Sequence, residues 1–186
     1  MLEQEYKIML TAAQYEAICA MYDWDEREEQ VNSYYDSPEM TYSKRHFTVR
    51  VRTIAGKFLL QMKLPANEAV SGAVTRIELE KELDGVPQTL SGAVLSELSG
   101  VERLPDARLL GTLTTFRSVK RLPGAEIDLD KSSYFGKTDH ELEIEFTEEA
   151  AARDILAEIS AHTDIDRSLP ATGKIRRFLA EYENQK

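Results

Sequence analysis

The chain begins with three charged side chains, Glu3, Glu5 and Lys7, whose types and spacing could support chemistry. In a β-strand, successive side chains point to opposite faces, so these three residues would share one face. Ile8 and Leu10 would lie on the opposite, apolar face. Two carboxylates beside an amine can bind a cation or an anion. Whether they do so depends on where the charged face points.

The same alternation recurs along the chain, and each stretch carries its own kind of charge. The alternating charged residues are Arg50 and Arg52; Arg76, Glu78 and Glu80; Glu126, Asp128 and Asp130; and Glu141, Glu143 and Glu145. For any one strand, the simpler explanation is a charged face that meets water while the apolar face packs on helices. Solvated faces usually mix Thr, Ser, Lys and Glu, so the separation of arginines from glutamates by strand favours an enclosed charged surface.

The elements that must position these residues follow from hydrophobic periodicity. Strands are expected over residues 3–10, 31–37, 42–53, 57–64, 74–83, 107–122, 125–132 and 139–146. Helices are expected after the capping box at residues 11–14, at residues 94–98, after Thr147 and around residues 174–182. With no linker between them, these elements predict one α+β domain over residues 1–186, dominated by antiparallel sheet.

An antiparallel eight-stranded β-barrel accounts for both the charged faces and the helices. Four apolar helix stripes are enough to cover the outer face of a curved sheet, and the charged faces would then line the interior. Periodicity alone does not prove closure of the sheet. We therefore expect a tunnel with a charged lumen and flanking helices.

The composition is typical of a soluble globular protein. Of 186 residues, 42% are hydrophobic and 30% are charged, and no apolar run is long enough to cross a bilayer. The single cysteine, Cys19, cannot form an internal disulfide, which fits a reducing compartment. We expect a cytoplasmic location without signal peptide or membrane anchor. The net charge of −10 argues against a general nucleic-acid binder, but clustered arginines could still hold an anionic ligand.

Glu3-x-Glu5-x-Lys7 resembles the signature that opens the CYTH domain of the triphosphate tunnel metalloenzyme family. Further elements follow in the family's order: Arg50-x-Arg52, Lys63, Arg76-x-Glu78-x-Glu80, Leu129-Asp130, Gly136 and Glu143-x-Glu145. Tyr34-Tyr35-Asp36 and the helix at residues 174–179 are similar to the bacterial branch. The first motif is weak by itself, whereas six elements in order over nearly the whole chain are a strong signal.

The chain departs from the family pattern in two places. Residues 135–140 form a polar stretch that is longer than the family's compact loop, so a longer loop is expected there. Glu141 adds a third acid in phase with Glu143 and Glu145, where the family has two.

The resemblance implies that the charged tunnel binds a triphosphate together with Mg²⁺ or Mn²⁺. The side chains expected to bind phosphate are Lys7, Arg50, Arg52, Lys63, Arg76, Arg117 and Lys174. The acids expected to hold metal are Glu3, Glu5, Glu78, Glu80, Asp130, Glu141, Glu143 and Glu145. Which two of the last three bind metal is left open.

Catalytic roles are expected for Glu3, Glu5 and Lys7. Phosphoryl transfer depends mainly on positioning and charge stabilisation, so no dedicated nucleophile is required. Glu3 or Glu5 would orient the attacking water. Lys7 would assist as a base if neighbouring cations lower its pKa.

The resemblance implies metal-dependent hydrolysis of a triphosphate. Inorganic tripolyphosphate is the first choice, because the sequence shows no clear pocket for a nucleobase or a thiazole ring. A class IV-type adenylate cyclase and a thiamine or nucleoside triphosphatase are alternatives. A non-catalytic sensor that binds polyphosphate or a nucleotide is an alternative of another class. The expected partner is a small-molecule triphosphate and not nucleic acid or a membrane, and a homodimer is left open.

Overall fold

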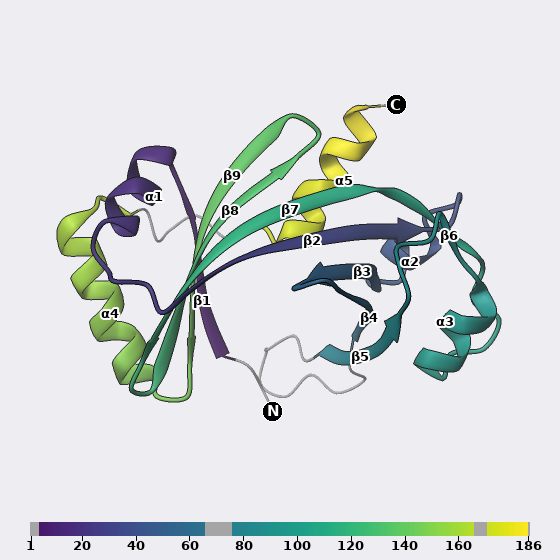
Figure 1. The fold of residues 1–186 in the computed structure, drawn as a ribbon, viewed down its shortest axis with the longest axis horizontal. Helices are drawn as coiled ribbons and strands as arrows, with labels where there is room; N and C mark the ends of the chain where they lie inside the picture. Colours follow the sequence, from purple (N-terminus) through teal and green to yellow (C-terminus); the bar gives the residue numbers. More distant parts are fainter. Residues whose placement is uncertain (1–3, 66–75, 166–170, 186) are drawn as a thin grey trace. The chain divides into compact units, whose positions relative to one another are not determined.

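The computed structural model describes residues 4–65, 76–165 and 171–185, which form nine strands and five helices (Figure 1). The strands are β1 (Gln4–Leu10), β2 (Glu26–Asp36), β3 (Thr48–Ile54), β4 (Lys57–Pro65), β5 (Arg76–Leu83), β6 (Thr89–Leu90), β7 (Ala107–Leu122), β8 (Ala125–Tyr134) and β9 (Lys137–Phe146). The helices are α1 (Ala12–Cys19), α2 (Thr41–Lys44), α3 (Gly92–Ser99), α4 (Glu149–His162) and α5 (Lys174–Asn184).

Neighbouring strands of the sheet are hydrogen-bonded in the order β1-β9-β8-β7-β2-β3-β4-β5, with β6 paired to β7. The pairings whose register is determined are all antiparallel. This confirms the predicted antiparallel sheet with flanking helices. The order has two ends, β1 and β5, and is therefore that of an open sheet. The predicted closure into a barrel is not shown by these pairings.

The chain divides into two compact units. Unit 1 comprises Met1–Glu29 and Thr114–Arg177, and unit 2 comprises Gln30–Leu113 and Phe178–Lys186. Strands β2 and β7 and helix α5 therefore each contribute residues to both units. That the whole chain acts as one domain stays a prediction.

In unit 1, helices α1 and α4 pack on the apolar face of β1, β8 and β9 (Figure 1). Ile8, Ile127 and Leu142 from the three strands lie in this core and are at most 5% exposed. A one-residue slip of any strand would turn such side chains to the other face, so the core fixes the register. It thereby also fixes the direction of the charged side chains between them.

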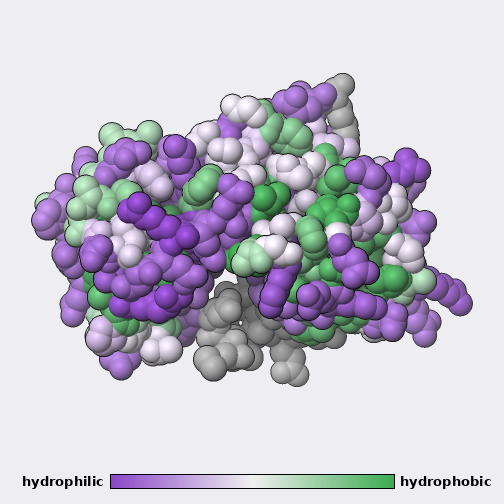
Figure 2. Space-filling model, in the orientation of Figure 1, coloured by the Kyte–Doolittle hydropathy of each residue, from purple (hydrophilic) through white to green (hydrophobic). Residues whose placement is uncertain are grey.

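In unit 2, a second core lies between helices α2 and α3 and the apolar face of β3 and β4. Val51, Leu60, Met62 and Leu95 are fully buried in it. Burial of these residues again assigns the remaining side chains of β3 and β4, including the predicted arginines, to the opposite face. Hydrophilic side chains cover much of the protein face that Figure 2 shows. Among the described residues, no helix is both long and apolar enough to cross a membrane.

The strand predicted over residues 42–53 is shorter than expected and begins at Thr48. Residues 41–44 form the short helix α2, and the side chain of Asp36, at the end of β2, binds backbone N–H groups where this helix begins. The Asp36 carboxylate accepts hydrogen bonds from the backbone N–H groups of Ser37, Tyr42 and Ser43 at 2.7 to 2.9 Å. Three satisfied donors and the buried Tyr42 ring outweigh the alternating pattern that suggested a strand.

The expectation of a long loop at residues 135–140 is wrong. Tyr134 pairs with Lys137 across β8 and β9, which leaves only Phe135 and Gly136 in the turn. Both have positive φ, 45° and 77°, as the two central residues of a tight hairpin turn require. The extra polar residues extend the two strands, so the charged face of β9 begins earlier than expected.

Candidate metal and phosphate site

One face of unit 1 gathers charged side chains from β1, β9, β8 and β7. Lys7 on β1 is opposite Glu143 on β9, and Glu143 is opposite Asp128 on β8. The next row of the same face contains Met9, Glu141, Asp130 and Arg117. Because the other face of these strands lies in the core, these side chains are held on one side of the sheet.

Four acids on this face are buried despite their charge. Asp128, Asp130, Glu141 and Glu143 are 0 to 5% exposed. Burying an isolated carboxylate is costly, so each needs cations or hydrogen-bond donors close by. The cations are Lys7, Arg117, Lys174 and Arg177.

Arg117 is the cation with the most complete set of partners. Its Nε lies 2.8 Å from Oδ1 of Asp130, and its Nη2 lies 2.6 Å from Oδ2 of the same carboxylate. Nη2 also contacts Oε2 of Glu143 at 2.9 Å, and Nη1 donates to Asp128. Burial opposes the charge of Arg117, but hydrogen bonding and attraction to Asp130 and its neighbours raise the guanidinium pKa. Arg117 therefore stays charged and donates hydrogen bonds to these acids.

Lys174, at the first turn of α5, bridges two strands of this face. Its Nζ lies 2.7 Å from Oε1 of Glu143 and 2.8 Å from Oδ2 of Asp130. Burial alone would raise the pKa of Glu143, but the charges of Lys174, Lys7 and Arg117 hold that pKa well below its usual range. Glu143 is therefore an anion that can bind a cation.

Both carboxylate oxygens of Glu141 contact cations of α5. Its Oε2 lies 2.5 Å from Nη2 of Arg177, and its Oε1 lies 3.3 Å from Nζ of Lys174. Arg177 is held in turn by Asp139, whose Oδ2 lies 2.8 Å from Nε. This arrangement ties Glu141 to the start of α5.

Lys7 lies beside acids rather than beside the cations that were expected to activate it. Its Nζ lies 3.1 Å from both Glu5 and Glu143 and 3.7 Å from Glu141. Burial lowers the pKa of Lys7, but Glu143 and Glu5 outweigh that effect and raise it overall. A role of Lys7 as a base was conditional on a lowered pKa, so the raised pKa does not favour that role, which stays a prediction.

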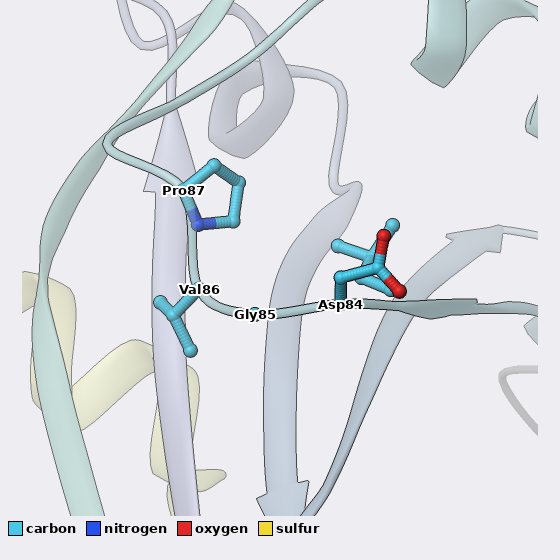
Figure 3. A pocket seen from close by; sticks show the side chains of 5 residues that line it. Asp84, Gly85, Val86 and Pro87 are labelled. Carbon is cyan, nitrogen blue, oxygen red and sulfur yellow. The ribbon is translucent and has the colours of Figure 1, made fainter.

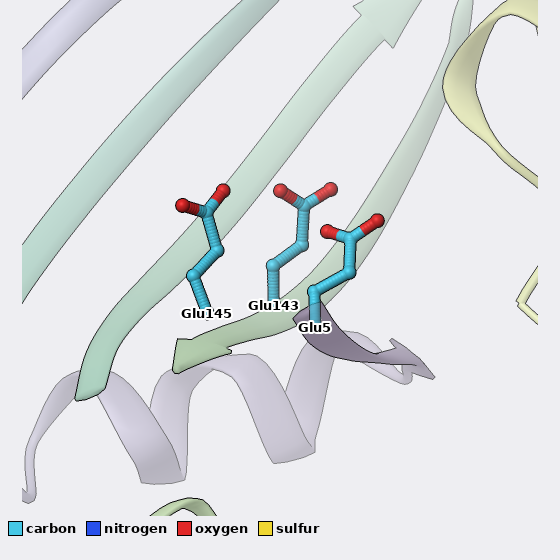
Figure 4. Close-up of side chains that lie close together, drawn as sticks. All are labelled: Glu5, Glu143 and Glu145. Atoms are coloured by element: carbon cyan, nitrogen blue, oxygen red, sulfur yellow. The ribbon is translucent and has the colours of Figure 1, made fainter. Parts of the chain in front are cut away.

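Glu5, Glu143 and Glu145 form a group that fits a metal ion. One carboxylate oxygen from each lies within 4.8 Å of the others, and the three side chains point to the same side of β1 and β9 (Figure 4). Mg²⁺ binds oxygen ligands at about 2.0–2.1 Å in octahedral geometry, so its ligand oxygens stand about 3 to 4 Å apart. The group meets this requirement with small adjustments. Glu3 was predicted to join it but lies outside the described residues.

The other predicted site residues lie in unit 2. Arg50 Nε donates to Gln61 Oε1 at 2.8 Å, and Arg52 Nε donates to Asn32 Oδ1 at 3.1 Å. Lys63 pairs with Glu78. These contacts place the two arginines and the lysine on one face of β3 and β4, as the alternation predicted.

The two acids predicted in β5 have partners of their own in unit 2. Glu78 pairs with Lys63, and Glu80 accepts a 2.6 Å hydrogen bond from Gln61. Among the described residues, Glu78 and Glu80 do not belong to the group of Glu5, Glu143 and Glu145. Arg76 begins β5 opposite Pro65.

Sequence reasoning assigned no role to Asp128, Asp139 or Arg177. Asp128 alternates in phase with Asp130, and Arg177 follows Lys174 by three residues on the same helix, so both positions carried a signal. Asp128 differs from its neighbours, because burial, together with Asp130, Glu145 and Glu143, raises its pKa to about 7 although Arg117 acts in the opposite direction.

Unit 2 contains a pocket of about 350 Å³. Leu83, Asp84, Gly85, Val86 and Pro87 line it (Figure 3). Its lining is mainly hydrocarbon and contains none of the residues predicted to bind phosphate or metal.

Comparison with known proteins gives a family match over most of the chain. The model of the CYTH domain matches residues 1–178. A curated relative, "Putative triphosphatase YjbK" of Bacillus subtilis (strain 168), is 28% identical over 185 residues, which cover 97% of this chain and 95% of the relative.

Two solved structures share the fold. A protein of Bacillus halodurans, described as a putative adenylate cyclase, has a TM-score of 0.72 and 24% identity over 95% of this chain and 97% of its own. HpAC1 of Hippeastrum, described as a putative adenylyl cyclase with a dominant triphosphatase activity, has a TM-score of 0.73 and 19% identity over 97% of this chain and 96% of its own.

Proposed function

Because the chain belongs to the CYTH family, we propose that it hydrolyses a triphosphate with the help of Mg²⁺ or Mn²⁺. The observation that carries this proposal is the group of Glu5, Glu143 and Glu145 on one face of β1 and β9. The relative whose name describes a triphosphatase, aligned over nearly its full length, supports the same reaction class.

Charge balance on this face favours a bound cation. Among the described residues, eight acids lie on or beside it, namely Glu5, Glu126, Asp128, Asp130, Asp139, Glu141, Glu143 and Glu145, and the cations that pair with them are Lys7, Arg117, Arg121, Lys174 and Arg177. Hard carboxylate oxygens of this kind suit Mg²⁺ or Mn²⁺. When bound, such an ion neutralises charge on the phosphate oxygens that it contacts.

The residues of this chain would then have separate tasks. Glu143 and Glu145 hold the cation, and Glu5, whose side chain is 39% exposed, also orients the attacking water by accepting its hydrogen bond. Lys7 keeps its charge and donates hydrogen bonds to the phosphate, a role that its raised pKa favours. Arg117 and Lys174 hold the buried acids in place, and direct contact of either with phosphate stays a prediction.

The phosphate-binding roles of Arg50, Arg52, Lys63 and Arg76, and the metal-binding roles of Glu3, Asp130 and Glu141, rest on the resemblance of their motifs. Barrel closure, a single functional domain and a cytoplasmic location are proposed on other grounds: the alternating charged faces, the lack of a linker and the single cysteine. Glu141 is the weakest of the three acids in phase on β9 as a metal ligand, because among the described residues it does not belong to the group of Glu5, Glu143 and Glu145.

Inorganic tripolyphosphate is the proposed substrate, and product analysis tests it. The protein is incubated with tripolyphosphate, thiamine triphosphate or ATP, each with Mg²⁺ or Mn²⁺. Release of pyrophosphate and orthophosphate from tripolyphosphate at the highest rate supports the proposal. Cyclic AMP and pyrophosphate from ATP would make the protein a cyclase, and tight binding without turnover would make it a sensor.

A further inference from the structure

Three polar side chains form a row across neighbouring strands of unit 2. Arg50 on β3 is the cross-strand partner of Gln61 on β4, and Gln61 is the partner of Glu80 on β5. Nε of Arg50 donates a 2.8 Å hydrogen bond to Oε1 of Gln61, and Nε2 of Gln61 donates a 2.6 Å hydrogen bond to Oε2 of Glu80. The amide of Gln61 therefore lies between a guanidinium group and a carboxylate.

A glutamine suits this position because its amide both accepts and donates hydrogen bonds. A guanidinium group can only donate and an ionised carboxylate can only accept, so the two neighbours fix the orientation of the amide. A carboxylate in place of Gln61 would pair with the charge of Arg50, and a lysine could not accept its hydrogen bond. Gln61 thus contacts Arg50 without neutralising it.

Arg50 differs in this respect from Arg117 of unit 1. Every nitrogen of the Arg117 guanidinium group contacts a carboxylate, Nε and Nη2 that of Asp130 and Nη1 that of Asp128. Among the described residues, Arg50 forms no ion pair, and its side-chain hydrogen bond uses Nε alone. Both Nη groups of Arg50 can therefore donate to an anion, and their planar geometry matches two oxygens of one phosphate group.

We propose that Gln61 is a positioning residue of the phosphate site: by holding Nε of Arg50, it fixes the plane of the guanidinium group and directs both Nη groups to the substrate. The inference rests on the proposed function, because it requires a triphosphate as the ligand of Arg50. A side chain that is ordered before binding loses less conformational freedom on binding, so the contact increases affinity. The second contact, with Glu80, holds the Gln61 amide itself in place.

The test is steady-state hydrolysis of tripolyphosphate in Mn²⁺, with KM and kcat measured separately. Gln61→Met keeps the length of the side chain and removes both hydrogen bonds. We expect its KM to rise about 3- to 10-fold, as the loss of one such bond implies, and its kcat to change by less than about twofold. Gln88→Met, the same exchange at an exposed position of unit 2, is the matched control and should leave KM unchanged. A fall in the folded fraction would lower kcat and leave KM as it is.

Two further variants separate positioning from other effects. If Gln61 acts through Arg50, adding Gln61→Met to Arg50→Ala should raise KM no further, so the two effects are not additive. Gln61→Glu should raise KM more than Gln61→Met, because a carboxylate would neutralise Arg50. The inference would be overturned by an unchanged KM in Gln61→Met, by the same rise in the Arg50→Ala background, or by a smaller rise in Gln61→Glu than in Gln61→Met.

The wild type and Arg50→Ala distinguish this inference from the proposed function. If Arg50→Ala raises KM and Gln61→Met does not, only the role of Gln61 fails. If Arg50→Ala leaves KM unchanged, the roles of Arg50 and Gln61 fail while hydrolysis stands. If the wild type does not hydrolyse tripolyphosphate, the proposed function and the role of Gln61 fail together.

Discussion

Arg117 and Asp130 are cross-strand partners joined by two nearly parallel hydrogen bonds, Nε to Oδ1 at 2.8 Å and Nη2 to Oδ2 at 2.6 Å. Asp130 is fully buried and the Arg117 side chain is 18% exposed. The pair joins β7 to β8, and Arg117 also contacts Glu143 of the proposed metal group. Its geometry makes Arg117 primarily a partner of buried acids.

Replacing Arg117 with Met should therefore destabilise the protein strongly. The change leaves Asp130, Asp128 and Glu143 without a shared cation, and breaking a buried pair in this way costs about 3–5 kcal/mol. The measurement is urea unfolding in EDTA. Arg121→Met on the same strand is the control: its side chain is 57% exposed, so its loss should cost much less stability than the loss of Arg117. Equal small losses in both variants would contradict the account of Arg117.

Two of the three acids in phase on β9, Glu141 and Glu145, should respond differently to neutralisation. Glu145→Gln should lose Mn²⁺ binding, whereas Glu141→Gln should retain it, because Glu141 lies outside the group of Glu5, Glu143 and Glu145. Calorimetric titration with Mn²⁺ measures both. Loss of binding in Glu141→Gln with retention in Glu145→Gln would reverse the assignment.

Arg50 should act on the substrate and leave the metal alone. Loss of a guanidinium group that binds phosphate removes about 1.5–3 kcal/mol, so Arg50→Ala should raise KM for tripolyphosphate by roughly 10- to 100-fold. Mn²⁺ affinity should not change. Lys57→Ala, at an exposed position on β4, is the control. An unaltered KM in Arg50→Ala would remove Arg50 from the phosphate site.

His140 should make the stability of the protein sensitive to mild acid. Its ring centroid lies 4.8 Å from that of Tyr15, and burial, with a smaller effect of Lys131, lowers its pKa below 6.5. A base whose pKa is lower in the folded state contributes stability that is complete above its unfolded pKa and is lost as pH falls from that value through the folded pKa.

The melting temperature of the wild type should thus fall relative to that of His140→Phe between about pH 7.5 and 5.5. Phenylalanine keeps a ring against Tyr15 while removing the titrating group. A constant difference between the two proteins across this range would show that the surroundings of His140 do not disfavour its charged form.

Alternation in the sequence was sufficient to predict which face each strand residue occupies. It placed Lys7, Asp130, Glu143 and Arg50 correctly on charged faces, because the apolar residues that alternate with them pack into the core on the opposite face. It could not predict their partners. The role predicted for Arg117, binding phosphate, stays a prediction. Its partner Asp130 was not predicted, because the register of β7 with β8 depends on contacts far apart in the sequence.

Local chemistry also overrode periodicity at two places. The segment around Tyr42 alternates like a strand. However, three backbone N–H groups donate hydrogen bonds to the Asp36 carboxylate, and residues 41–44 form α2 instead. The Phe135-Gly136 turn required a positive φ at a phenylalanine, which sequence patterns rarely indicate. Neither case changes the face that a site residue occupies.

The central claim is that the acids of β1 and β9 hold a metal ion for triphosphate hydrolysis. Orthophosphate release from tripolyphosphate, measured for the wild type, Glu145→Gln and Glu126→Gln in Mn²⁺ and in EDTA, tests it most directly. We predict rapid release by the wild type and Glu126→Gln in Mn²⁺, none in EDTA, and a loss of about 100-fold or more in Glu145→Gln. Release that persists in EDTA, or that Glu145→Gln leaves unchanged, would contradict the claim.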